Sequence, residues 1–150
     1  MKITLTSEES LRLEQAPGPM TIEAESSDRQ YSPFHMLASG LALCTYSILA
    51  SWATTAKLAA TRLVIDVSWT FADDPHRVGT MDVSFDWPEL PVNRRAAARR
   101  VAELCTVHAT LMHPPAITIH AAGETAPSAA PGVAHTPAPA AGAPVGAGRS

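Results

Sequence analysis

One long apolar segment, residues 33–54, limits most strongly what this chain can fold into. Apolar residues recur along it at spacings of three and four, the period of one helix face. Pro33 after Ser32 is typical of a helix start, because serine caps a helix and proline fits its first turn. Polar residues interrupt the segment at His35, Ser39, Thr45, Ser47 and Ser51. We therefore expect an amphipathic helix in a protein core rather than a continuous membrane span.

Five residues of this helix, spaced by 4, 3, 4 and 4 positions, are expected to form one buried stripe. They are Leu37, Leu41, Cys44, Ile48 and Trp52. This pattern places Cys44 in the middle of a buried or half-buried face. Small residues between 38 and 42 would let another element approach closely. Apolar residues also extend past the stripe, at Phe34, Leu43 and Leu49, which is more than the surface helix of a monomer should carry and predicts a dimer.

Alternating apolar and polar residues predict strands on both sides of this helix. Three short strands are expected before it and two long strands, paired as an antiparallel hairpin, after it. Their ranges are 2–6, 11–15, 20–25, 63–71 and 78–87. A second helix is predicted from Asn93, as its N-cap, to about Met112, followed by a last short strand at 116–120. The expected fold class is α+β, in the order βββ-α-ββ-α-β.

The C-terminal residues differ in composition from the rest of the chain. Residues 122–150 consist mainly of alanine, proline and glycine and contain no aromatic residue. Such a segment cannot bury enough apolar surface to offset the entropy of ordering it. The sequence therefore predicts one folded domain, residues 1–121, and a disordered tail, residues 122–150.

The charge pattern excludes some classes of partner. The net charge is −3, and the basic residues cluster only at Arg94-Arg95 and Arg99-Arg100, which we interpret as a solvated helix face. A nucleic-acid-binding surface needs a larger basic surplus, so no nucleic acid partner is expected. The chain opens with Lys2 and a strand pattern instead of a hydrophobic signal segment, which predicts a cytoplasmic protein.

The chain has two cysteines, Cys44 and Cys105. In a cytoplasmic protein, two cysteines indicate thiol chemistry or inert residues rather than a structural disulfide. His108 follows Cys105 by three residues on the same helix face. Because two ligands do not make a zinc site, we expect neither a metal nor a cofactor.

The residues around both cysteines form motifs. In the first, Ser32-Pro33 precedes a helix of small and apolar residues, with Cys44 eleven residues after the proline. The second reads Cys105-Thr106-Val107-His108-Ala109-Thr110-Leu111. Both resemble the OsmC/Ohr family (osmotically inducible and organic-hydroperoxide-resistance proteins), whose second motif is Cys-Pro-Val-x-x-Thr-Leu. The chain is similar to a divergent OsmC-like member over residues 1–121.

This resemblance implies a fold and an activity. The fold would have two long central helices with antiparallel sheets, in an intertwined homodimer with active sites between subunits. The activity would be a thiol peroxidase that reduces organic hydroperoxides, with Cys44 as the peroxidatic and Cys105 as the resolving cysteine. The cycle would produce a disulfide that an external dithiol reduces.

The chain departs from the family pattern at the residue that should hold the activating arginine. Peroxidase members carry a glutamate one residue after the proline, where this chain has Phe34, and another branch of the family carries it two residues after, where this chain has His35. Arg29, in the loop before the helix, is the candidate for the arginine that stabilises the thiolate of Cys44. His35 either reaches over the site as a substitute or is an exposed residue of the first helical turn. The alternative function is a non-catalytic OsmC-like dimer that binds a small apolar ligand or acts as a redox-sensitive module.

Overall fold

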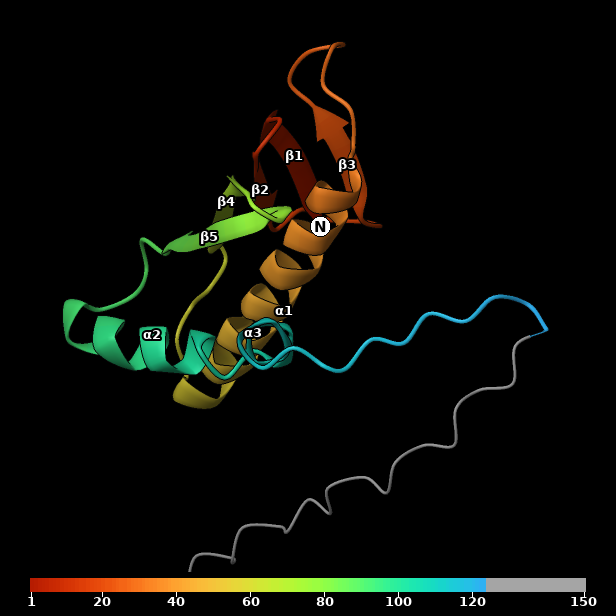
Figure 1. Cartoon of the computed structure of the whole chain (residues 1–150). Helices are drawn as coiled ribbons and strands as arrows, with labels where there is room; N and C mark the ends of the chain where they lie inside the picture. The colour runs from red at the N-terminus through yellow and green to blue at the C-terminus, as the bar shows by residue number, and fades with distance from the viewer. Residues whose placement is uncertain (124–150) are drawn as a thin grey trace, which may run out of the picture. The chain divides into compact units, whose positions relative to one another are not determined.

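The computed structural model describes residues 1–123, of which Met1–Pro115 form one compact unit. Its strands are β1 (Lys2–Ser7), β2 (Ser10–Glu14), β3 (Thr21–Ala24), β4 (Val64–Asp73) and β5 (His76–Asp86). Its helices are α1 (Pro33–Ala56), α2 (Arg95–Ala102) and α3 (Thr106–Met112), with a short 3-10 turn at Val92–Arg94 before α2 (Figure 1). The predicted α+β class is confirmed, and all five strands predicted before residue 90 are present.

The strands form one five-stranded sheet in the order β3-β1-β2-β4-β5. Neighbouring strands are antiparallel except for β1 and β3, which are parallel, so the sheet is mixed rather than purely antiparallel as expected. The parallel pair arises because the loop after β2 returns the chain to the far side of β1. The inward residues of the central strands, such as Leu13 and Ile65, are fully buried, as their alternation predicts.

Helix α1 packs against β2 and β4 of the sheet and also contacts α2 and α3. Its buried face is not the predicted stripe. Of the five stripe residues only Leu41 is buried, whereas Leu37 is exposed and the other three are half-buried. The buried residues are His35, Ala38, Ser39, Leu41, Ala42, Thr45, Leu49 and Ala53. Most of them are small, because a helix backbone approaches a sheet closely only where short side chains separate them.

Helix α1 is also long and apolar enough to cross a membrane by length and composition. Core helices of globular domains meet the same criterion. Polar side chains lie on its buried face, at His35, Ser39 and Thr45, where they make contacts within the fold. This placement is that of a core helix packed on a sheet.

The second long helix is not continuous, which corrects the prediction of one helix from Asn93 to Met112. The chain leaves helical geometry at Cys105, whose φ of −58° and ψ of 127° are extended, and α3 begins at the next residue. Cys105 caps α3, because its Sγ accepts a hydrogen bond from the His108 N–H at 3.4 Å. Leu104, predicted on the buried stripe, is 69% exposed at this break. Asn93 lies in the 3-10 turn and caps neither helix.

The predicted last strand, residues 116–120, has no regular secondary structure. Its two isoleucines, Ile117 and Ile119, are 83% and 90% exposed. An alternating pattern gives a strand only where its backbone N–H and C=O groups have a neighbouring strand to pair with. The predicted tail begins at residue 122, and its residues 124–150 lie outside the described part of the chain.

Candidate functional site

The break between α2 and α3 brings the two cysteines together. Cys44 lies half-buried on α1, and Cys105 is fully buried at the start of α3. Their sulfur atoms are close enough for the two side chains to hydrogen-bond. Both thiols are free. Two residues 61 positions apart in the sequence thus form one thiol pair, as a two-cysteine cycle requires.

The pKa of Cys44 depends on burial and on the groups next to its sulfur. Burial of its sulfur raises the pKa of Cys44, whereas donation from the Cys105 thiol and from the backbone N–H groups of Val107 and Thr106 lowers it. The donors outweigh burial, so the pKa of Cys44 lies below that of an ordinary cysteine. A thiolate is the nucleophilic form of cysteine, so this environment favours reaction at Cys44.

Cys105 has the opposite character. Burial raises the pKa of its thiol, and the hydrogen bond to Cys44 raises it further. The backbone N–H of His108 and the Thr45 hydroxyl donate to its sulfur and lower the pKa in part, but the net shift is upward. At neutral pH Cys105 therefore keeps its proton, which it donates to Cys44. The pair is asymmetric, with one nucleophile and one protonated partner.

A cavity of about 290 Å³ adjoins this pair. Thr45 and His108, which both bind the Cys105 sulfur, form part of its wall. Its apolar lining comes mainly from β5, at Met81, Val83 and Phe85. Arg99 and Glu103 complete it with charged groups. The His108 ring donates through Nδ1 to the Glu103 carbonyl at 3.0 Å, which leaves Nε2 unprotonated in the neutral ring.

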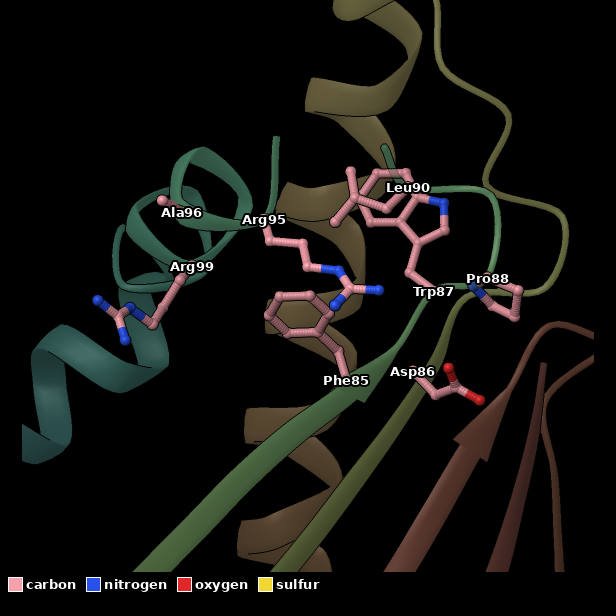
Figure 2. Close-up of a pocket in the computed structure, with 8 residues that line it drawn as sticks. All are labelled: Phe85, Asp86, Trp87, Pro88, Leu90, Arg95, Ala96 and Arg99. Carbon is pink, nitrogen blue, oxygen red and sulfur yellow. The ribbon is translucent and has the colours of Figure 1, made fainter. Parts of the chain in front are cut away.

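A larger cavity, of about 600 Å³, lies nearer the start of α2, between this helix and the end of β5 (Figure 2). Phe85 and Trp87 form its aromatic wall, and the Arg95 guanidinium extends from α2 toward their rings, whereas the Arg99 guanidinium points away from them. It shares Phe85 and Arg99 with the smaller cavity, and neither cysteine lines either of the two cavities. The larger cavity also lacks Thr45 and His108, the residues that connect the smaller one to Cys105. Two residues of the predicted solvated arginine face therefore border a cavity.

His35 does neither of the two things predicted for it. It is only 2% exposed, so it is not a surface residue of the first turn. Its ring is held by the β1–β2 turn and the helix cap instead of lying over Cys44: Nε2 donates to the Ser7 carbonyl at 3.0 Å, and Nδ1 accepts from the Ser32 N–H at 3.2 Å. Phe34, at the other glutamate position, packs edge-on against Phe71 with ring centroids 4.9 Å apart. Both positions serve the fold.

Arg29 lies in the loop before α1, next to Asp28. Its backbone N–H donates to the Ser26 carbonyl at 3.2 Å. Cys44 lies eleven residues into α1, about 16 Å along the helix axis. Among the described residues, the groups that shift the pKa of Cys44 do not include Arg29. Its role in stabilising the thiolate stays a prediction.

Sequence reasoning identified both cysteines but missed the groups that surround them. Thr45 was noted only as a polar interruption of α1, and the N–H groups of Thr106 and Val107 were assigned to the middle of a continuous helix. The resembled motif has a proline at the position of Thr106, and proline is typical of the first turn of a helix. That position of the motif could have indicated a helix start after Cys105. Within residues 1–123, no group of three or more His, Cys, Asp or Glu side chains is placed to hold a metal ion.

Comparisons with known proteins agree with this architecture. A family model described as OsmC-like protein matches residues 26–120, which include both cysteines. The crystal structure of an osmotic stress induced and detoxification response protein from Psychrobacter arcticus 273-4 has a TM-score of 0.51 at 18% identity, covering 72% of this chain and 84% of that chain. That of an OsmC-like hydroperoxide resistance protein from Jannaschia sp. CCS1 has a TM-score of 0.47 at 20% identity, covering 67% and 73%. No curated protein sequence matches significantly.

Proposed function

The chain belongs to the OsmC-like protein family, and we propose that it is a thiol-dependent peroxidase that reduces organic hydroperoxides through a two-cysteine cycle. The observation that carries this proposal is the hydrogen-bonded pair of Cys44 and Cys105, with the pKa lowered at one sulfur and raised at the other. The family is associated with hydroperoxide resistance, in agreement with this chemistry.

The cycle has three balanced steps. The Cys44 thiolate attacks the terminal oxygen of the hydroperoxide, the O–O bond breaks, and the alkoxide takes up a proton and leaves as an alcohol. Cys44 is then a sulfenic acid. The Cys105 sulfur loses its proton and attacks the Cys44 sulfur; the S–O bond breaks, and water leaves with that proton. An external dithiol reduces the resulting disulfide and is itself oxidised to a disulfide.

The apolar wall of the smaller cavity fits the organic part of such a substrate. Met81, Val83 and Phe85 offer no hydrogen-bonding side chain. Thr45 and His108, which bind the Cys105 sulfur, line the same cavity. The reaction removes two electrons from the thiol pair in each turnover, so the enzyme needs a reducing compartment. We place it in the cytoplasm for this reason.

We propose that the active form is a homodimer. Met36, Leu37 and Leu43 of α1 are 61%, 38% and 37% exposed, and Met112 at the end of α3 is 64% exposed. Large apolar side chains at this level of exposure are typical of a surface that another subunit covers. A partner packed on α1 would also shield the half-buried Cys44 from water.

The absence of the motif glutamate favours a second function, which is ligand binding without catalysis. Phe34 and His35 are tied into the fold, and no carboxylate takes the place of the glutamate in residues 33–43. Without it the chain would be a non-catalytic OsmC-like dimer that binds a small ligand. The cavity between Phe85, Trp87 and Arg95 would then suit an apolar molecule with an anionic group (Figure 2).

Peroxide oxidation of the two cysteines distinguishes these functions. After one equivalent of cumene hydroperoxide, the wild-type protein should contain a Cys44–Cys105 disulfide, detected by mass spectrometry of the unreduced peptides. Cys44→Ser should abolish hydroperoxide consumption. Cys105→Ser should complete a single turnover that stops at the sulfenic acid or an overoxidised form. If Cys44 of the wild type stays reduced, the peroxidase proposal fails and the binding function replaces it.

A further inference from the structure

We propose that the larger cavity, between the start of α2 and the end of β5, binds an aromatic carboxylate. Arg95 pairs with the carboxylate, and Phe85 and Trp87 contact the ring (Figure 2). This site goes beyond the peroxidase cycle, because neither cysteine lines the cavity. It deepens the second function proposed above, on which it rests for its purpose, by naming the class of ligand.

The cavity has the size and lining of a small-molecule site. Its volume of about 600 Å³ lies within the range that such sites occupy, roughly 300 to 1,000 Å³. Trp87 and Leu90 are each 5% exposed and, together with the half-buried Phe85, supply apolar lining. An apolar ring placed there would leave water and cover apolar surface at the same time, which favours binding.

The aromatic wall is held in place before any ligand binds. The indole N–H of Trp87 donates to the Ala59 carbonyl at 2.8 Å, so the polar group of this ring is already satisfied within the fold. The ring also packs edge-on against Trp52 of α1, with ring centroids 6.0 Å apart. Because these two contacts fix the indole, a ligand that packs on it has little further side-chain entropy to remove.

Arg95 supplies a positive charge that no acid of the fold neutralises by contact. Its guanidinium extends from α2 toward the rings of Phe85 and Trp87 (Figure 2). Within residues 1–123, the Arg95 side chain makes neither an ion pair nor a hydrogen bond. A guanidinium offers two parallel N–H donors, which match the two oxygens of a carboxylate. The charge and its direction therefore favour a carboxylate at the edge of the apolar wall.

Two acids near the end of β5 are directed elsewhere. Asp86 borders the cavity, but its carboxylate lies on the side of β5 away from Arg95 (Figure 2). Glu89, in the turn after β5, accepts hydrogen bonds from the side chains of Thr61 and Arg62, both at 2.9 Å. The cavity thus combines an unpaired cation with an apolar wall, and its complement is an anion joined to an apolar ring.

The test measures binding of 1-naphthoate to the full-length protein by isothermal titration calorimetry. The neutral compound 1-naphthalenemethanol has the same ring without the charge. The wild type should bind the carboxylate about tenfold more tightly, since a hydrogen bond to a charged group contributes more than a neutral one. Inorganic phosphate at the same concentration should not displace 1-naphthoate, because it has no ring. Equal affinity for the two naphthalenes, or displacement by phosphate, overturns the inference.

A pair of variants tests whether Arg95 makes the contact. Arg95→Gln removes the charge at an exposed position and keeps a good helix former there. The matched control, Arg100→Gln, removes the same charge from the same helix but lies outside both cavities. Arg95→Gln should weaken binding of 1-naphthoate by about tenfold and leave binding of the alcohol unchanged. If both variants weaken it equally, the effect is one of net charge and the assignment to Arg95 is overturned.

NMR spectra of the wild type locate the ligand. The indole N–H signal of Trp87 should shift as 1-naphthoate binds, whereas that of Trp69, which lines neither of the two cavities, should not. A shift at Trp69 without one at Trp87 overturns the site.

Peroxide oxidation of Cys44 is a separate result. A protein that binds 1-naphthoate at this site and leaves Cys44 reduced refutes the peroxidase and keeps the cavity as a binding site. A protein that oxidises Cys44 and does not bind 1-naphthoate overturns the inference and keeps the peroxidase.

Discussion

Replacement of the buried histidine of α1 by alanine should destabilise the fold by about 3 kcal/mol. His35 is 2% exposed, and each ring nitrogen makes a hydrogen bond, one to the Ser7 carbonyl and one with the Ser32 N–H. Each bond contributes about 1 kcal/mol. Its ring also packs edge-on against Trp69 with centroids 5.0 Å apart, and the loss of this contact with the cavity left behind costs about 1 kcal/mol more.

Urea unfolding at pH 7, followed by tryptophan fluorescence, measures this change in the free energy of unfolding. The matched control is His76→Ala on β5. His76 also stacks on an aromatic ring, Phe71, at 5.1 Å, but it is exposed, so its loss should cost about 0.5 kcal/mol or less. The reasoning is refuted if His35→Ala and His76→Ala destabilise the protein equally, because burial and the two ring hydrogen bonds are what distinguish them.

Three further predictions concern the site and the subunit interface. Because the pKa of Cys44 is lowered, its rate of alkylation should rise with pH and reach half of its maximum at a lower pH than free cysteine does; a midpoint at or above that of free cysteine contradicts the assignment. The stability that this depressed pKa contributes should be lost as the pH falls through it. Met36→Glu, on the exposed side of α1, should convert the proposed dimer to a monomer in sedimentation velocity. The control Glu103→Gln, at an exposed site outside α1, should leave the dimer intact. If the two variants sediment with the same mass, this face of α1 is not the interface.

The strands of the sheet could be predicted from the sequence because the alternation of apolar and polar residues follows the alternation of buried and exposed side chains. Each central strand has one face on the core, so its apolar residues recur with a period of two. The pairing of β1 with β3 could not be predicted in the same way. A short strand such as β3, whose four residues are all exposed, carries no pattern that tells a parallel neighbour from an antiparallel one.

The predicted buried face of α1 was wrong because the prediction was based on the large apolar residues. A helix that packs tightly on a sheet buries its small ones, here Ala38, Ala42 and Ala53, and leaves larger side chains such as Leu37 at the edge of the contact or outside it. Hydrophobicity alone does not separate a face that meets the sheet from one that meets a second subunit. Both faces of α1 are apolar, which is why the helix also has the composition of a membrane span.

The cysteine pair could be predicted from the motifs, whereas the environment of the pair could not. The break before α3 depends on Cys105 capping that helix with its sulfur, and cysteine is not a residue that helix-start patterns anticipate. The consequence is chemical. A continuous helix would have hydrogen-bonded the N–H groups of Thr106 and Val107 to its own preceding turn. The break leaves these N–H groups without carbonyl partners in a preceding turn. They are among the groups that lower the pKa of Cys44, so the break that the sequence did not predict also affects the chemistry of the site.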